Sequence, residues 1–227
     1  MQYSISLFFL LLSTSVAAQT GDTAVLKVQY TEDHSLRADT SAAFWKEAVW
    51  IDMPRREGSA LYQTKFKLLY SAKGVYCLFF SEDKRITSTI KENFADLYNE
   101  DVVEAFFWPE PSSTVYFEYE LSPRNYELPI LVPNYNGKFL GWLPWHYDGE
   151  RKTKHETTIY SNRSWTAAFF IPYALLKPLP NVPPQKGTTW RANFYRIDYD
   201  ENSTSWSWQL TGPSFHDLAA FGTLLFD

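Results

Sequence analysis

Three glutamates lie in two neighbouring stretches that have the composition of β-strands. Glu104 lies within the apolar stretch 102–107, whose alternation places it on an apolar face. Glu118 and Glu120 share one face of the next stretch, 116–121. A bare charge is costly to bury, so an acid on such a face must be paired or used. Two nearby carboxyls could hydrolyse a glycosidic bond, one as acid and the other as nucleophile or base. They could also accept hydrogen bonds from sugar hydroxyls, or lie on the exposed side of a sheet.

A run of oxygen-bearing side chains forms a candidate metal site. Asp198, Asp200 and Asn202 occupy alternate positions. Oxygen atoms are the ligands that hard cations such as Ca²⁺ require, so the run predicts a structural calcium ion. The run lacks the glycine and the distal glutamate of a helix–loop–helix calcium loop. A solvated turn is the alternative interpretation.

Other catalytic and metal-binding motifs do not occur in the sequence. It contains neither a phosphate-binding glycine loop nor a Gly-x-Ser-x-Gly elbow. The histidines are scattered, and none pairs with another at metal-ligand spacing: His34, His146, His155 and His216. The single cysteine, Cys77, cannot form an internal disulfide and lies in an apolar stretch, which favours a place in the core.

The composition is that of a soluble globular protein rich in aromatic residues. Among 227 residues, 21 are basic and 26 are acidic, which gives a formal net charge of −5. This balance argues against a nucleic-acid partner. Aromatic residues make up 18% of the chain. Aromatic side chains bury large areas and also offer flat surfaces for stacking. We therefore expect a rigid core, and further aromatic rings that could stack on a ligand.

The first residues have the features of a signal peptide. Residues 1–18 carry no charged side chain and contain an apolar run that ends at Val16-Ala17-Ala18. The apolar run is much shorter than the roughly 20 residues that span a bilayer. We therefore expect cleavage near Ala18 and a secreted or periplasmic protein that does not span the membrane. A buried N-terminal strand is the alternative.

The elements that must position these residues are β-strands. Stretches rich in Val, Ile, Tyr, Phe, Trp and Thr follow one another, separated by turn residues. They lie at 24–30, 61–70, 74–81, 101–108, 114–121, 164–171 and 189–199. Helical signals are confined to single turns at 44–48 and 172–177. No linker divides the chain, so residues 19–227 are predicted to form one all-β domain, a single antiparallel β-sandwich or a barrel.

Several of these segments resemble those of family 9 carbohydrate-binding modules. Residues 97–107 (LYNEDVVEAFF) are similar to the family's aromatic-x-x-Asp-x-Val-Glu-x-Phe segment. The other similar segments are its paired strands at 67–70 and 74–80, its Tyr-Tyr-Glu-Phe-Glu-Val-Asn-Pro strand at 116–123, its Trp-Arg-x-Asn-Phe-Tyr-Arg segment at 190–196, and its closing Trp-Ser and Phe-His-x-Pro-x-x-Phe-Gly pattern at 206–224. In this order they extend over about residues 24–227. The resemblance implies a jelly-roll-like β-sandwich that binds the ends of sugar chains between two aromatic rings, often with structural calcium.

The resemblance also implies a set of site residues. The two stacking rings fall at Tyr98 and Phe215, where xylanase-linked members have tryptophan. Glu104 matches the family's sugar-binding glutamate, and Glu120 stands where an arginine helps in those members. Trp208 and His216 are expected to line the edge of the site.

The function that follows is non-catalytic binding of polysaccharide or oligosaccharide ends outside the cytoplasm, in support of glycan catabolism. The alternative is a glycoside hydrolase that acts through Glu104 with Glu118 or Glu120. A structural subunit whose sugar site has decayed is a third interpretation, since rings and an arginine have changed. Haem is not expected, because Met53 is the only methionine after the leader and no histidine adjoins a matching motif.

Overall fold

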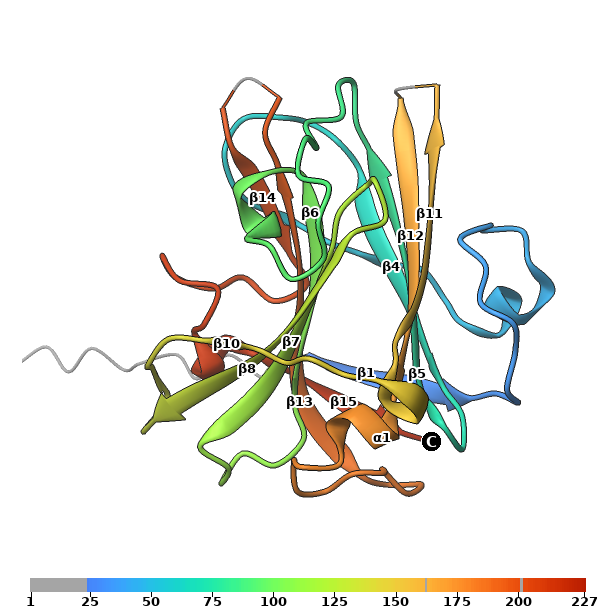
Figure 1. Ribbon diagram of the computed structural model, residues 1–227, viewed down its shortest axis with the longest axis vertical. Helices are drawn as coiled ribbons and strands as arrows, with labels where there is room; N and C mark the ends of the chain where they lie inside the picture. The colour runs from blue at the N-terminus through green and yellow to red at the C-terminus, as the bar shows by residue number, and fades with distance from the viewer. Residues whose placement is uncertain (1–23, 162, 201) are drawn as a thin grey trace, which may run out of the picture.

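β-Strands dominate the computed structural model, which describes residues 24–161, 163–200 and 202–227 (Figure 1). The expected signal peptide, residues 1–18, lies outside the described residues. The strands are β1 (Val25–Tyr30), β2 (Ile51–Asp52), β3 (Arg55–Glu57), β4 (Thr64–Tyr70), β5 (Gly74–Glu82), β6 (Val102–Trp108), β7 (Val115–Leu121), β8 (Glu127–Tyr135), β9 (Lys138–Phe139), β10 (Leu143–Pro144), β11 (Lys154–Tyr160), β12 (Ser164–Pro172), β13 (Thr189–Asp198), β14 (Thr204–Ser207) and β15 (Gly222–Phe226). The helical elements are α1 (Tyr173–Leu176) and the 3-10 turns η1 (Ala43–Glu47), η2 (Leu97–Asn99), η3 (Gly149–Arg151) and η4 (Leu218–Ala220).

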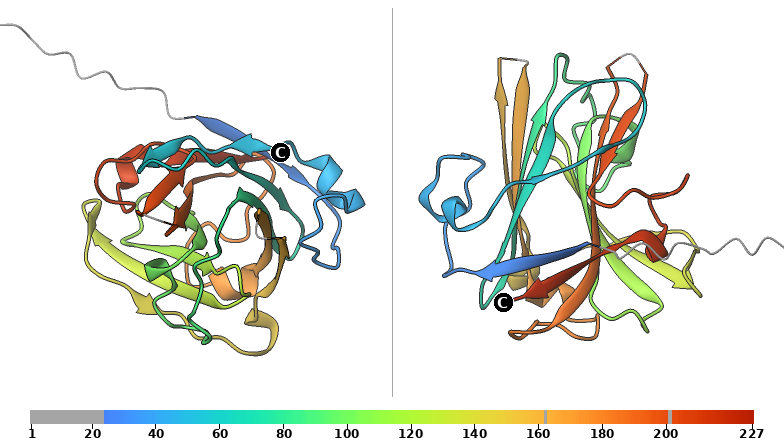
Figure 2. Two further views of the ribbon diagram at one scale, coloured as in Figure 1. Left: turned by 90° about the horizontal axis from the view of Figure 1, so that it is seen from above. Right: turned by 180° about the vertical axis from the view of Figure 1, so that it is seen from behind.

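Two sheets pack face to face and are joined by β1, so that the predicted all-β sandwich is confirmed (Figure 2). The first sheet has the order β10-β8-β7-β6-β13-β15-β1 and the second the order β1-β4-β5-β12-β11. The pairs are antiparallel, as predicted, except where β1 takes part: Val25–Val28 pair in parallel with β15, and Gln29 and Tyr30 pair in parallel with β4. Parallel pairing is possible here because long connections, not hairpins, join β1 to both neighbours.

Alternating side chains of both sheets fill the space between them with aromatic rings. Phe194 of β13 lies at the centre of this core, with its ring centroid 4.1 Å from that of Phe66 on β4. Tyr119 of β7 and Phe169 of β12 meet across the sheets at 4.6 Å. Cys77 is fully buried in the same core, and burial raises the pKa of its thiol well above the ordinary value. The expected structural place of this cysteine is therefore confirmed.

The outer faces of the two sheets are covered by chain segments that carry their own apolar side chains. The segment 38–48, with Trp45 fully buried, covers the outer face of β4, β5 and β12. On the first sheet, β6 directs Val103, Ala105 and Phe107 into the inter-sheet core, while Phe106 belongs to a separate cluster on the outer face. The alternation of β6 thus places Glu104 on the outer face together with Phe106, as the sequence predicts.

Most predicted strands are found within two or three residues of their expected ends. The strands outside the predicted stretches are the long β8 and β11 and the shorter β2, β3, β9, β10, β14 and β15. β8 contains Pro129 and Pro133, which have no N–H group to donate and therefore weaken a strand signal. They are tolerated because the neighbours of β8 on its outer side, β9 and β10, are only two residues long. The two expected helical turns are found as η1 and α1.

Candidate functional site

A group of three buried glutamates lies on the outer face of the first sheet. Glu104 of β6 is directly opposite Glu120 of β7, and Glu118 lies two residues before Glu120 on the same face. Glu104 is 2% exposed, Glu118 is 5% exposed and Glu120 is 0% exposed. The β6–β7 register therefore brings together the three acids that the sequence singles out.

Three segments that cover this face form the walls of a pocket above the glutamates, with a volume of about 390 Å³. One wall is Tyr98 in η2, and the second is the segment from Phe139, the last residue of β9, to Trp142, just before β10. The third wall is the segment 213–216, which precedes η4. The ring of Tyr98 meets that of Trp142 edge to face, with a centroid distance of 6.3 Å. Half-buried aromatic rings over a polar floor form a site with both apolar and polar surfaces.

The glutamates favour their protonated forms. Burial raises the pKa of Glu104 to about 8. Burial, followed by repulsion from the neighbouring carboxyls, raises the pKa values of Glu118 and Glu120 well above the ordinary value. Glu118 Oε2 and both carboxyl oxygens of Glu120 have no hydrogen-bond partner. Among the described residues that line the pocket there is no lysine or arginine. A protonated carboxyl both donates and accepts hydrogen bonds, so the floor can make both kinds of hydrogen bond with a ligand that reaches it.

This pattern does not separate an acid from a base, as glycoside hydrolysis requires. A glycosidase keeps one carboxyl protonated and the other ionised by giving them different environments. In Glu104, Glu118 and Glu120 the same cause, burial, raises all three pKa values. The electrostatics of the pocket thus resemble those of a binding site more than those of a hydrolase.

Five of the residues expected at a sugar site line this one pocket, although they come from distant parts of the chain: Tyr98, Glu104, Glu120, Phe215 and His216. Trp208 does not, and its expected place at the edge of the site is wrong. It lies in the inter-sheet core, with its ring 5.9 Å from that of Phe194. Gly222 makes this place possible, because a Cβ atom there would lie 2.4 Å from the ring of Trp208.

Phe215 lines the pocket without a free face for stacking. Its ring is stacked on Tyr195 at 4.3 Å with an interplanar angle of 7°, and the guanidinium of Arg56 lies 4.9 Å from its centroid. A sugar could stack on Phe215 only by displacing one of these neighbours. The two rings expected to stack on a sugar, Tyr98 and Phe215, thus both line the pocket, but Phe215 already has stacking neighbours of its own.

Phe139 and Trp142 are two aromatic residues of the pocket wall that the sequence analysis missed. Phe139 is 37% exposed and stacks on His216, with a centroid distance of 4.0 Å and an angle of 13°. Burial lowers the pKa of His216 to about 4, so this ring is neutral at neutral pH. The signal that could have found them is the turn Asn136-Gly137, where both residues have positive φ. Such a turn makes a hairpin that projects the following aromatic residues from the sheet.

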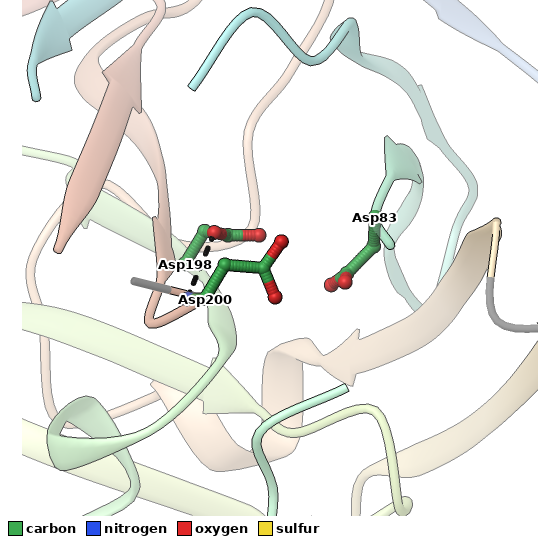
Figure 3. Close-up of side chains that lie close together, drawn as sticks. All are labelled: Asp83, Asp198 and Asp200. Atoms are coloured by element: carbon green, nitrogen blue, oxygen red, sulfur yellow. Dashed lines mark hydrogen bonds between the residues drawn. The ribbon is translucent and has the colours of Figure 1, made fainter. Parts of the chain in front are cut away.

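A second polar cluster lies at one end of the sandwich, where β5 and β13 end. Arg196, fully buried, donates to Asp198 Oδ2 at 2.6 Å and to Asp83 Oδ2 at 3.2 Å. Figure 3 shows Asp198 and Asp200 side by side and facing Asp83. Asp200 accepts a hydrogen bond from the hydroxyl of Tyr62, and its other carboxyl oxygen is buried without a hydrogen-bond partner.

The three aspartates of this cluster could hold a metal ion. One oxygen from each of Asp83, Asp198 and Asp200 lies within 4.8 Å of the others. Burial raises the pKa of Asp198 to about 6, and that of Asp83 is also raised by burial. Of the three expected ligands, Asp198 and Asp200 are in the cluster. Asn202 is exposed and lines an adjoining pocket together with Asp200.

Comparisons of the sequence with known proteins find one relative of moderate similarity. No family model matches the chain. A protein of Arthroderma benhamiae named "Extracellular protein" is 26% identical over 164 residues, which are 67% of this chain and 71% of that protein. Within the described residues, no helix is long and apolar enough to cross a membrane.

Solved structures give the stronger likeness. A candidate carbohydrate-binding protein from Bacteroides uniformis has a TM-score of 0.75 at 16% identity, covering 91% of this chain and all of that one. A family 9 carbohydrate-binding module from Caldicellulosiruptor kristjanssonii has TM-scores of 0.67 in complex with cellotriose and 0.66 with glucose, each at 16% identity. These matches cover 90% of this chain and 94% and 96% of the module chains. The chain thus has the fold of the carbohydrate-binding β-sandwiches. In particular, it has the fold of family 9 modules, as the sequence resemblance implies.

Proposed function

We propose that this protein binds carbohydrate, without catalysis, in the pocket between Tyr98, Trp142 and the three glutamates. The observation that carries the proposal is the buried floor of Glu118 and Glu120, whose oxygens have no hydrogen-bond partner and could be paired by sugar hydroxyls, which both donate and accept. Rings at the rim pack against the apolar face of a sugar, while a few polar groups bind its hydroxyls. The same fold binds cellotriose and glucose in the modules of Caldicellulosiruptor kristjanssonii.

The proposed setting is outside the cytoplasm, where the protein would support the breakdown of polysaccharides by binding their ends. Support comes from the expected leader at residues 1–18 and from the relative named as an extracellular protein. Residues 19–227 would then be the mature binding domain.

Replacing Trp142 with alanine should weaken cellotriose binding by roughly 1–3 kcal/mol, by analogy with the stacking of bases on aromatic side chains. The ring forms part of the rim and is only half-buried, so the melting temperature should change little. Isothermal titration calorimetry measures the affinity. The matched control is Tyr135→Ala, which removes a 65% exposed ring from β8 that does not line the pocket. Equal affinities for Trp142→Ala and the unmodified protein would contradict the proposed site, and release of reducing sugars would support the hydrolase alternative.

We also propose that the ion suited to the aspartate cluster is Ca²⁺, in a structural role. Asp83, Asp198 and Asp200 offer only oxygen ligands, which suit this cation. Arg196 already neutralises part of their charge, so the ion would be held chiefly through Asp200. Its Oδ1 is buried without a hydrogen-bond partner and has only the exposed Arg85 nearby, at 3.6 Å.

An ion that binds only the folded protein raises its stability, by about 2.7 kcal/mol at ~100 times the dissociation constant. Millimolar Ca²⁺ should therefore raise the melting temperature and a chelator should lower it. Asp200→Asn, which leaves the Arg196 pairs in place, should abolish this response. A melting temperature that responds to neither addition would overturn the calcium proposal.

A further inference from the structure

The pocket glutamates differ from the other buried carboxylates of this protein in what surrounds them. Asp198 is paired with Arg196 at 2.6 Å. Glu127 accepts hydrogen bonds from a tyrosine and a threonine hydroxyl and lies 3.3 Å from a histidine ring. Glu118 and Glu120, by contrast, have three buried oxygens without a hydrogen-bond partner. The fully buried acids outside the pocket all have a cation or a hydrogen-bond donor beside them. The lack of such a partner at Glu118 and Glu120 points to a ligand that supplies it.

Nothing that lines the pocket in the described part of the chain supplies positive charge. The titratable side chains that face the three carboxyls are Tyr98, Tyr116, Tyr195, Tyr199 and His216. The hydroxyl of Tyr195 donates to the Phe215 carbonyl at 2.7 Å, and that of Tyr199 donates to the Tyr98 carbonyl at 2.9 Å. The nearby guanidinium of Arg56 donates to Thr211 and Ser205 outside the pocket. At neutral pH and below, these carboxyls can therefore ionise in the pocket only if a ligand brings the positive charge.

We infer that the pocket selects a sugar unit that carries a protonated amino group, such as β-1,4-linked glucosamine, over the neutral glucose unit of the same shape. This inference rests on the proposed function and specifies its ligand. An ammonium group offers three N–H donors and a positive charge, which match the free acceptors of Glu118 and Glu120. The rings of Tyr98 and Trp142 at the rim attract a cation as well as the apolar face of the sugar.

Binding of an ammonium group should be coupled to the release of protons. In the free pocket, burial keeps protons on Glu104 and its neighbours at neutral pH. When the ammonium enters, it stabilises ionised carboxylate, and the carboxyl proton goes to the solvent. A neutral sugar brings no charge and leaves the carboxyls protonated. Proton release therefore distinguishes the two kinds of ligand independently of affinity.

The experiment compares three trisaccharides by isothermal titration calorimetry at pH 5, where the free amino sugar is already protonated: the β-1,4-linked trimers of glucosamine, N-acetylglucosamine and glucose. Each titration is repeated in two buffers with different ionisation enthalpies, which reports the number of protons released. The glucosamine trimer should bind about ten-fold or more tightly than cellotriose, as expected for hydrogen bonds to charged groups, and it alone should release protons. Glu120→Gln should reduce the ratio of the two affinities towards one. Glu150→Gln, at an exposed glutamate outside the pocket, should leave the ratio unchanged.

The possible outcomes distinguish a failure of the amino-sugar inference from a failure of the proposed function. If cellotriose binds as tightly as the glucosamine trimer, or if no protons are released, the amino-sugar inference is wrong and the proposed function stands. If none of the three sugars binds the folded protein, both are overturned. A melting curve of Glu120→Gln checks that it folds, and Glu118→Gln provides a second test at a neighbouring carboxyl. An unchanged affinity ratio in both folded variants would also overturn the inference.

Discussion

Replacing Arg196 with methionine should lower the free energy of unfolding by about 3–5 kcal/mol, the range typical of breaking a buried ion pair. The side chains of Arg196, Asp83 and Asp198 are completely buried, and the guanidinium contacts both carboxylates. Its Nη1 also donates to the Thr64 hydroxyl at 3.0 Å. Methionine has a similar volume but leaves two aspartates in the interior without a counter-charge. Urea denaturation followed by tryptophan fluorescence measures the loss.

The matched control for this substitution is Arg85→Met, which acts on the same end of the sandwich. The Arg85 side chain is 62% exposed and lies 3.6 Å from Asp200, so its removal should change stability by no more than about 1 kcal/mol. A loss below 1 kcal/mol for Arg196→Met would show that the buried pair is unimportant. Burial lowers the pKa of Arg196 from its ordinary value, but three neighbouring aspartates and Tyr62 oppose this shift.

Replacing Glu104 with glutamine should make the protein more stable at alkaline pH and flatten its dependence on pH. The pKa of Glu104 is raised from 4.5 to about 8 in the folded protein. Between these values the folded state binds more protons than the unfolded state, so the free energy of unfolding falls as pH rises. The contribution of one such group to this slope is at most about 1.4 kcal/mol per pH unit. Glutamine has no proton to lose and removes that contribution.

Chemical denaturation at pH 5 and pH 8 tests this prediction. The difference between the two stabilities should be clearly smaller for Glu104→Gln than for the unmodified protein. Glu92→Gln, at an exposed position outside the pocket, should leave the difference unchanged. Parallel stability curves for Glu104→Gln and the unmodified protein would show that burial of this carboxyl does not destabilise the fold at alkaline pH. Stabilisation would instead indicate that the pocket keeps its acids at the expense of stability, as functional sites often do.

Much of the fold and the site could be predicted because each signal was local or ordered. Alternation within 102–107 is a period-two pattern, so it correctly places Glu104 on the outer face of β6. The ordered motifs correctly gather Tyr98, Glu120 and His216 into one pocket with it. Local signals failed where contacts between distant parts of the chain decide which way a side chain points. Trp208 follows the short strand β14, and its direction depends on the space left by a glycine fourteen residues later.

The rest of the site depends on contacts that no local pattern encodes. The ion pair of Arg196 joins the end of β13 to Asp83, 113 positions earlier in the chain. Both faces of the Phe215 ring have neighbours from other elements, Tyr195 on β13 and Arg56 on β3. Whether a ring is free to stack is therefore set by the assembled fold, and the motif around Phe215 could not reveal it.

The parallel pairing of β1 with β15 has a consequence for how the chain folds. Val25 lies opposite Thr223, so the first and the last strand of the described chain pair with each other. Almost all of the described residues lie in the loop between them. Closing such a long loop loses much conformational entropy, and topologies with distant contacts fold slowly. Until β15 has been synthesised, β1 lacks this partner and its edge is open. The pairing between β1 and β15, and with it the complete first sheet, can therefore form only after β15 has been synthesised.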